Sequence, residues 1–597
     1  MLEKYQNYIV AAILLIIFAI SIGTALGDAA IMDEVAHIPA GYTYLKYGDY
    51  RLNPEHPPLL KDLAGIPLQF LNVNFPTDEK YWTTDSNGQW DAGWRFIYLP
   101  ENNTEKILFW SRFPIILIAL FLGFLIFKWA KELFGTKTGL LALTLYAFDP
   151  NILGHNHYVT TDLGIAAFLF FAFYFFLKYL KYPNWKTIFL AGIFMSLAQL
   201  AKFSAVLMFP VFAITLIAYI FFRKEKINFY FLGSGKIKRF WFQKFYLYAT
   251  SFIILFLIHV LLIGIVYQLN IYRMPTEKIH ELINTQLYGG TQKITSPYLH
   301  KMADNQIFRP YSQYLTGLFM VFGRVAGGNT TYFFGQVTNQ SFREYFPIVF
   351  LIKEPLPILI FLLSAMAIAI YFVLRNNLAD FPRHIWKNVQ NYLNKHIAET
   401  AMLLFIALYA YVSITGNLNI GFRHLFPILP FMYILISKEI VFLWIKLRGN
   451  MKKIYSVVIG VLLCWLVAET AFAYPYYLAY FNETIGGSKN GYKYVTDSNV
   501  DWGQELKRLK IFIDENKIDK IRVDYFGGGD VGYYLGNKAI IWHAHMGQEP
   551  GWYAISATFL QNSLYYKITE GEPDYQWLRE REPFAVVGNS ILVYKIE

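Results

Sequence analysis

The segment from Met32 to Lys61 reads MDEVAHIPAGYTYLKYGDYRLNPEHPPLLK. It opens with two adjacent acids, Asp33 and Glu34, and it follows a long apolar run at residues 9–26. An apolar run of about 18 residues is at the length needed to cross a bilayer. We therefore interpret this stretch as the start of the first external loop of a membrane protein. The alternative is a polar loop whose acids only keep it hydrated.

The composition excludes a soluble globular protein. Hydrophobic residues make up 55% and aromatic residues 19% of the 597 residues, and the mean hydropathy is +0.32. Long apolar runs recur along the chain, which is typical of a polytopic membrane protein. The net charge of +11 is expected to lie in cytoplasmic loops, so no nucleic-acid partner is implied. A single cysteine, Cys464, excludes a disulfide within the chain.

The first apolar run has a second interpretation as a signal peptide, because small residues follow it at 25–30. Its length is long for the apolar core of a signal peptide. The acids behind it also have to be held at the membrane. We expect an uncleaved first span.

The apolar runs predict about 11 membrane spans within a transmembrane domain at residues 1–473. Long polar segments at 27–106 and 268–345 separate some of them, and the first of these carries the candidate catalytic acids. Basic loops lie at 128–137, 178–186, 223–244, 375–396 and 446–453. They alternate with acidic or aromatic loops. Because cytoplasmic loops carry the excess of Lys and Arg, we expect a cytoplasmic N-terminus and both long segments outside. The expected location is the plasma (inner) membrane.

Two breaks are predicted within the spans. Asp149-Pro150 should end the third span, because the residue before a proline disfavours helix. Residues 187–222 are apolar for longer than one bilayer needs, with Lys202 as their one charge. We expect two spans hinged near Lys202, at the same face as Asp33 and Asp162.

Residues 474–597 have the composition of a small soluble domain, which we expect to be an extracytoplasmic α+β domain. Asp501 is expected to cap a helix that runs to Asn516. Residues 521–526 alternate as a strand, and 585–594 read as a hairpin.

A glycine-rich segment of this domain, Gly527 to Gly532, matches the pattern GxGxxG after a strand. No convincing helix follows it, and it is expected outside the cell, where dinucleotides are scarce. We interpret it as a tight glycine turn rather than a dinucleotide site.

Three acids, Asp33, Glu34 and Asp162, are expected at one membrane face. An ionised carboxylate at membrane depth costs at least about 2.5–3.5 kcal/mol, so such residues are functional candidates. Carboxylates can take a proton from a hydroxyl group. Their simplest alternative role is to keep a loop hydrated.

The cations Lys202, Arg112 and Arg423 are expected near these acids. Cations can stabilise a leaving phosphate. The alternative for Lys202 is a lysine that snorkels to the interface, and the two arginines could anchor lipid headgroups.

A divalent metal ion is the one cofactor that we consider. Glu55 and His56, with His155, His157 and His424, could supply ligands, but no spacing among them is diagnostic. The alternative is that these histidines are solvated or structural.

The chain resembles the GT-C membrane glycosyltransferases, and within them glycosyltransferase family 39. This family includes the dolichyl-phosphate-mannose–protein mannosyltransferases and the bacterial aminoarabinose transferases of lipid A. The resemblance begins with Asp33-Glu34 after the first span and covers nearly the whole chain. Its further motifs are Glu55-His56-Pro57-Pro58-Leu59, Ser111-Arg112-Phe113-Pro114, the segment from Asp149-Pro150 to Asp162, Lys202, Tyr345-Phe346-Pro347, Lys353-Glu354-Pro355, Gly421-Phe422-Arg423-His424 and the segment from Asp497 to Gln504.

The resemblance implies a GT-C fold and the inverting transfer of a hexose or pentose. The donor would be a sugar on a polyprenyl phosphate in the membrane lipid. The acceptor would be a hydroxyl on a protein, lipid or glycan at the outer face. It implies Asp33 as general base, Glu34 and Asp162 as further catalytic acids, and Lys202, Arg112, Lys61 and Arg423 as donor-phosphate ligands. Related lipid A transferases have Glu-Lys where this chain has Glu55-His56, which opens a metal role for this pair.

Two other classes compete with this interpretation. A transporter or lipid flippase would also bury charges between spans, but transporters commonly show internal repeats and charges near the midplane. We find no repeat in the sequence, and the candidate charges lie toward one surface. An envelope scaffold with a partner-binding tail would leave these charges without a purpose.

Overall fold

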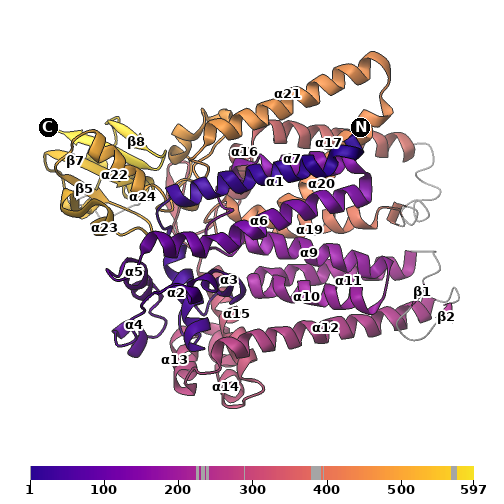
Figure 1. Cartoon of the computed structure of the whole chain (residues 1–597), viewed down its shortest axis with the longest axis horizontal. Coiled ribbons are helices and arrows are strands. Elements are labelled where there is room, and N and C mark those ends of the chain that lie inside the picture. Colours follow the sequence, from indigo (N-terminus) through magenta and orange to yellow (C-terminus); the bar gives the residue numbers. More distant parts are fainter. Residues whose placement is uncertain are drawn as a thin grey trace.

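The computed structural model describes residues 2–222, 228–229, 235–236, 241–287, 289–377, 392–393, 395–565 and 574–597. Long helices run side by side along the longest axis, and a smaller mixed domain at one end holds the C-terminus (Figure 1). The N-terminus lies toward the opposite end of the helices. Much of the predicted basic loops 223–244 and 375–396 lies outside the described residues.

Nine helical segments of the described chain are long and apolar enough to cross a membrane. They are α1 (Leu2–Gly27), α6 (Thr104–Phe134), α9 (Asp162–Lys181), η2 with α11 (Phe203–Leu207, Met208–Phe222), α12 (Trp241–Ile271), α17 (Leu356–Asn377), α19 (Ile397–Thr415), η3 with α20 (Phe422–Ile428, Leu429–Lys446) and α21 (Gly449–Ala473). The other two predicted spans are shorter, since α7 (Thr136–Ala147) has 12 residues and α10 (Trp185–Ala201) has 17. The predicted polytopic helical class is confirmed.

The two predicted breaks both occur. Helix α7 ends at Ala147, and the side chain of Asp149 then accepts a hydrogen bond from Asn151 N at 2.8 Å, which caps the short α8 (Pro150–Leu153). Lys202 is extended, with φ −160° and ψ 142°, between α10 and η2. Both breaks place polar residues at the end of a helix, where backbone groups need partners.

The segments that the sequence analysis expects outside contain short helices. After α1 come α2 (Met32–Tyr47), α3 (Leu59–Gly65), η1 (Pro67–Phe70), α4 (Lys80–Thr83) and α5 (Gln89–Tyr98); between α12 and α17 come α13 (Thr276–Gln286), α14 (Gly290–Asp304), α15 (Arg309–Gly327), the hairpin β3–β4 (Thr331–Phe333, Gln336–Thr338) and α16 (Tyr345–Lys353). Helices α2 to α5, α13 and α14 gather at the end that carries the C-terminal domain (Figure 1).

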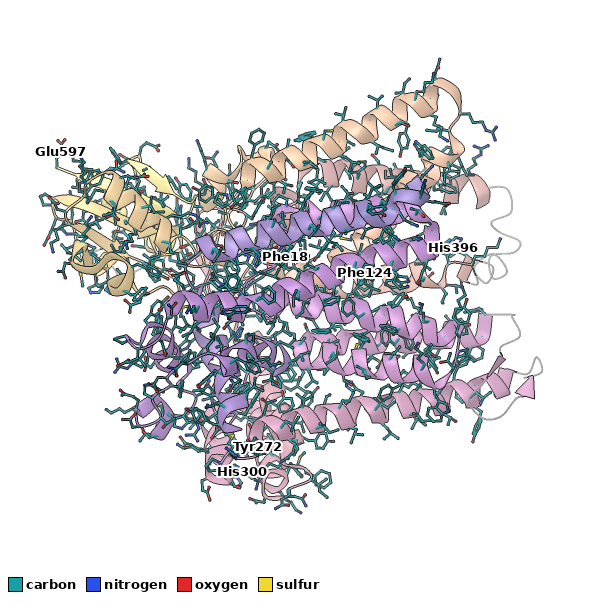
Figure 2. All side chains as sticks on the ribbon, viewed as in Figure 1. Phe18, Phe124, Tyr272, His300, His396 and Glu597 are labelled. Carbon is teal, nitrogen blue, oxygen red and sulfur yellow. The ribbon has the colours of Figure 1, made fainter. Side chains whose placement is uncertain are left out.

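The two ends of the helical bundle carry different loops. Lys137 and Lys452 lie over the ring of Trp444 at 3.7 and 3.9 Å, so the basic loops at 128–137 and 446–453 meet. His396 lies at the opposite end of the molecule from Glu597 (Figure 2). The small strand pair β1–β2 (Asn228–Phe229, Gly235–Lys236) is antiparallel.

The C-terminal domain is built on a five-stranded sheet in the order β6-β5-β7-β9-β8. Strand β5 is parallel to β6 and β7, while β9 is antiparallel to β7 and β8. The strands are β5 (Ile521–Asp524), β6 (Ala539–Ile541), β7 (Gly551–Ser556), β8 (Ala585–Val587) and β9 (Ile591–Ile596), with helices α22 (Leu506–Glu515), α23 (Val531–Leu535) and α24 (Ala557–Tyr565). The predicted strand at 521–526 and hairpin at 585–594 are confirmed.

The helix for which Asp501 was the predicted cap begins four residues later than expected, with Glu505 at the N-cap position and Leu506 as its first residue. The intervening backbone is used for docking instead. Trp502 O accepts a hydrogen bond from Met32 N at 3.1 Å, and Gln504 O accepts one from Ala29 N at 3.0 Å. The segment before α22 therefore pairs with the chain between α1 and α2.

Candidate active site

Four of the predicted site residues form one chain of ion pairs. Arg423 Nη1 lies 2.8 Å from Asp33 Oδ2 and 3.2 Å from Asp162 Oδ2. Lys202 Nζ lies 2.7 Å from Asp162 Oδ1. The four side chains come from the first turn of α2, the start of α9, the break after α10 and η3. The structure thus brings Asp33, Asp162, Lys202 and Arg423 to one place.

Asp33 is the most exposed of the four ion-paired residues, with 29% of its side chain exposed. Its one hydrogen bond to the described residues is made by Oδ2, which leaves Oδ1 available. Burial alone would raise the pKa of this carboxyl, but the charges of Arg423 and His37 outweigh burial and hold the pKa below its ordinary value. Asp33 is therefore an ionised carboxylate with an oxygen free to accept a proton.

Arg423 keeps one edge of its guanidinium open. Both of its hydrogen bonds leave from Nη1. Its Nε is buried and has no acceptor among the residues that the structure describes. The Nε and Nη2 edge is the fork that binds carboxylates and phosphates with two parallel hydrogen bonds. The described residues leave this edge of Arg423 without an acceptor.

Lys202 also has donor capacity to spare. Its ammonium carries three N–H groups, and the described residues accept one of them, at Asp162 Oδ1. Its side chain is 18% exposed. Asp162 accepts from both cations, so it holds Lys202 and Arg423 beside each other.

Glu34 and Arg112 form a separate, closed ion pair. Their side chains are both 0% exposed. Arg112 donates from Nε and Nη2 to Glu34, and its other three N–H groups go to the carbonyl oxygens of Ala25, Asp28 and Ala29. All five N–H groups of Arg112 are used, so none is left for a phosphate. This geometry assigns the predicted pair to holding the turn between α1 and α2.

The ammonium of Lys61 likewise makes all of its hydrogen bonds within the protein. Its Nζ donates to Tyr44 Oη at 2.8 Å, to Asn53 O at 2.7 Å and to His56 O at 2.8 Å. The side chain is fully buried, and burial lowers the pKa of its ammonium well below its ordinary value. Donor counting thus separates the four predicted phosphate ligands: Lys202 and Arg423 are open, whereas Lys61 and Arg112 are saturated.

Glu55 and His56 do not come together as metal ligands. Glu55 lies 3.7 Å from Arg324, and the ring of His56 packs edge-on against His37. The described part of the chain contains no group of three or more His, Cys, Asp or Glu that could hold a metal ion. These residues do not fit a metal site, so we derive no step through a metal.

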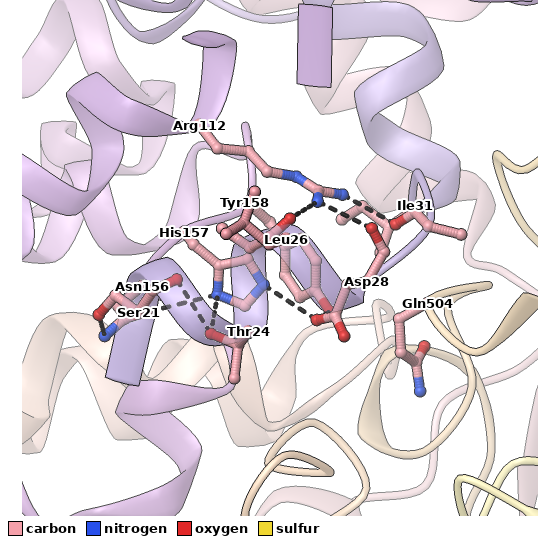
Figure 3. A network of polar contacts seen from close by, with 12 residues as sticks. Ser21, Thr24, Leu26, Asp28, Ile31, Arg112, Asn156, His157, Tyr158 and Gln504 are labelled. Atoms are coloured by element: carbon pink, nitrogen blue, oxygen red, sulfur yellow. Dashed lines mark hydrogen bonds and ion pairs between the residues drawn. The ribbon is translucent and has the colours of Figure 1, made fainter. Parts of the chain in front are cut away.

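The segment from Asn156 to Tyr158 forms a polar network that the sequence did not reveal. Asp28 Oδ2 accepts hydrogen bonds from His157 Nε2 at 3.0 Å and Tyr158 Oη at 2.5 Å (Figure 3). Asp28 Oδ1 accepts one from Arg508 of α22 at 2.8 Å. This network joins the end of α1, the loop before α9 and the C-terminal domain.

The C-terminal domain also reaches the ion-pair chain. The guanidinium of Arg423 lies over the ring of Trp502, 3.9 Å from its centre. Asn499 Oδ1 accepts a hydrogen bond from Phe422 N at 2.9 Å, next to Arg423. Asp497 has a left-handed backbone, with φ 56°. The sequence singled out this segment as a motif but gave it no role, because nothing local shows what it contacts.

An apolar groove of about 530 Å³ lies between α16, α17, α19 and η3 with α20. Leu425 and Ile428 of η3 line it, together with Phe346 and Phe350 of α16. The same short helix therefore carries Arg423 toward the ion pairs and apolar side chains toward the groove.

Comparison with known proteins finds one matching family model and several similar solved structures. The family model of the dolichyl-phosphate-mannose-protein mannosyltransferases matches residues 104–263, a region that includes Asp162 and Lys202. No curated protein matches the sequence.

Among solved structures, the S. cerevisiae protein O-mannosyltransferase Pmt1-Pmt2 complex bound to the sugar donor aligns with a TM-score of 0.53 at 11% identity, over 79% of this chain and 90% of that chain. ArnT from Cupriavidus metallidurans bound to undecaprenyl phosphate has a TM-score of 0.42 at 10% identity, over 99% and 98%. Archaeoglobus fulgidus AglB, in complex with an inhibitory peptide and a dolichol-phosphate, has 0.43 at 12%, over 94% and 71%.

The Pmt1-Pmt2 alignment and the matched family region point the same way as the motifs. Residues 104–263 are thus similar to the dolichyl-phosphate-mannose-protein mannosyltransferases, and the chain as a whole has a fold similar to that of the Pmt1-Pmt2 complex.

Proposed function

We propose that this protein transfers a sugar from a polyprenyl-phosphate donor to an acceptor hydroxyl at the outer face of the membrane, with inversion. One observation carries the proposal. A partly exposed carboxylate, Asp33, is ion-paired to Arg423, whose Nε and Nη2 make no hydrogen bond to the residues that the structure describes. A proton acceptor and an anion-binding fork thus lie within one ion pair.

The chemistry uses both groups. Asp33 Oδ1 takes the proton of the acceptor hydroxyl as its oxygen bonds to the anomeric carbon of the sugar. The bond between that carbon and the phosphate oxygen breaks, and its electron pair leaves with the polyprenyl phosphate. General-base assistance of this kind contributes typically about 10²–10⁴-fold. Attack from the face opposite the phosphate inverts the anomeric carbon.

The leaving phosphate gains negative charge, which cations held in place can stabilise. Arg423 offers the two-pronged edge, and Lys202 offers its remaining N–H groups. Asp162 orients both cations and is not placed against the substrate. Glu34, Arg112 and Lys61 act as a buried frame in this scheme, because their hydrogen-bonding groups are used within the protein.

The apolar groove beside η3 supports a lipid-linked donor. A polyprenyl chain carries no group that needs a hydrogen bond, so an apolar groove within the helical bundle suits it. Leu425 and Ile428 place this groove directly after Arg423 in the chain. A phosphate at Arg423 could extend its tail into the groove.

The proposed orientation places the C-terminal domain outside and the N-terminus in the cytoplasm. The meeting of basic loops around Trp444, away from the C-terminal domain, supports it through the excess of Lys and Arg in cytoplasmic loops. The proposed location is the plasma (inner) membrane, and the acceptor is a protein, lipid or glycan hydroxyl.

The test is a transfer assay in proteoliposomes with a set of radiolabelled polyprenyl-phosphate sugars and membrane-derived acceptors. We expect the wild-type protein to move label into acceptor, and Asp33→Asn to reduce the rate about 10²–10⁴-fold. Asp91→Asn is the matched control, because Asp91 is an exposed acid in α5 of the same external segment. It should keep the wild-type rate.

Two outcomes would contradict the proposed function. Full transfer by Asp33→Asn would remove Asp33 as the base. A wild-type protein that moves the labelled lipid between leaflets without releasing sugar would be a flippase instead.

A further inference from the structure

The C-terminal domain contacts Arg423 and the residue before Asp33. The ring of Trp502 lies under the guanidinium of Arg423, and the carbonyl oxygen of Trp502 accepts a hydrogen bond from Met32 N, one residue before Asp33. Trp502 is 1% exposed. It is therefore a buried residue that bridges Arg423 and the start of the helix that carries Asp33.

The ring of Trp502 restricts a rotation of the Arg423 guanidinium that the ion pairs do not fix. Both carboxylates bind Arg423 through Nη1, which fixes that nitrogen but lets the plane of the guanidinium turn about it. A flat ring 3.9 Å from Arg423 favours a parallel arrangement of the two planes. The direction of the open Nε and Nη2 edge then depends on the ring.

The domain is held at several other points around Trp502, so its position is defined. Arg508 is ion-paired to Asp28 at 2.8 Å, and Gln504 lies near Asp28 and Ile31 (Figure 3). Gly528 approaches so closely that an added Cβ would lie 2.3 Å from Ile31 O. The glycine turn that the sequence analysis singled out is thus a docking contact just before Asp33.

We infer that Trp502 is a positioning residue of the active site, which makes the C-terminal domain a required part of the enzyme that sets the phosphate-binding edge of Arg423. This inference rests on the proposed function for its activity readout. Without the ring, Arg423 keeps its charge and its ion pairs but loses the fixed direction of its fork.

The test replaces Trp502 with Leu and with Phe in the full-length protein. We expect Trp502→Leu to lower kcat for sugar transfer about 5- to 30-fold, which corresponds to the loss of one desolvated cation–ring contact. Trp502→Phe should fall between Leu and the wild type, because a phenyl face binds cations less strongly than an indole face. Loss of packing volume would rank the three residues in the same order, so the ranking has to be combined with a measurement at Arg423 itself.

A second measurement does not depend on transfer. An arginine-specific dicarbonyl reagent, read by mass spectrometry at Arg423, should modify Trp502→Leu several-fold faster than the wild type. Trp542→Leu is the matched control, since Trp542 is a buried tryptophan of the same domain with Arg522 4.9 Å from its ring. It should leave both kcat and the labelling of Arg423 unchanged.

Wild-type kcat in Trp502→Leu, or equal labelling of Arg423 in all variants, overturns the inference. Absence of transfer in the wild type overturns the proposed function instead, while faster labelling in Trp502→Leu alone would still support positioning. Should Trp502→Leu not be recovered as a monodisperse protein, Trp502→Phe decides by the same two measurements, with an expected effect of about 2- to 5-fold.

Discussion

The same substitution at two arginines separates the two roles that the structure assigns. Arg423→Lys and Arg112→Lys each keep a positive charge and remove a planar fork. Arg423 has an open Nε and Nη2 edge, whereas Arg112 uses all five N–H groups within the protein. We expect the first variant to lose affinity for the donor phosphate and the second to lose stability.

The magnitudes follow from the hydrogen bonds. The fork of Arg423 would make two hydrogen bonds to a phosphate, and a lysine can replace one of them. Losing one hydrogen bond to a charged group costs about 1.5–3 kcal/mol, or about 10- to 150-fold in Kd. At Arg112, an ammonium with three donors leaves at least two of the five acceptors without the hydrogen bond that the arginine makes, at about 1–3 kcal/mol each. The apparent unfolding temperature should fall by several degrees.

The assay uses purified protein in detergent with a polyprenyl phosphate that carries no sugar. Its Kd is measured by titration and its unfolding by a thermal scan without ligand. Arg423→Lys should raise Kd and leave the unfolding temperature near the wild-type value, while Arg112→Lys should do the reverse. An unchanged Kd in Arg423→Lys, or a raised Kd in Arg112→Lys with full stability, would refute the donor-counting argument.

Two further predictions concern stability. Gly41→Ala should destabilise the protein strongly, because the new Cβ would lie 1.9 Å from Lys61 O, whereas Gly460→Ala, with nothing within 4 Å, should be neutral in the same thermal scan. Burial raises the pKa of Asp501 to about 7 from 3.8, so the folded state binds more protons than the unfolded state between these values. Stability should therefore fall as pH rises through this window, by up to about 1.4 kcal/mol per pH unit. Asp501→Asn keeps an acceptor for Thr558 N and should flatten that slope; a slope equal to the wild type would contradict it.

Much of the fold follows from local patterns in the sequence. Apolar runs mark the spans, Asp149-Pro150 marks the break after α7, and a lone charge marks the break at Lys202. The hairpin β8–β9 follows from alternation around a Gly-Asn turn. Each of these features depends on residues that are close together in the sequence, so the sequence alone is enough to predict it.

The site could be predicted only in part, because its contacts join distant segments. Asp33 and Arg423 are 390 residues apart. The sequence pointed to both as charged residues near a membrane face, but it could not show which cations are already saturated. Arg112 and Lys61 look like phosphate ligands until their hydrogen bonds are counted. Trp502 lies within the motif from Asp497 to Gln504, but nothing local shows that its ring contacts Arg423.

The most direct measurement is a cryo-EM structure of the protein with a polyprenyl phosphate bound. We predict a phosphate within hydrogen-bond distance of Nε and Nη2 of Arg423 and of Lys202 Nζ, with its lipid tail in the groove lined by Leu425. A phosphate bound at Arg112 or Lys61, or anywhere that leaves the open edge of Arg423 unfilled, would contradict the account.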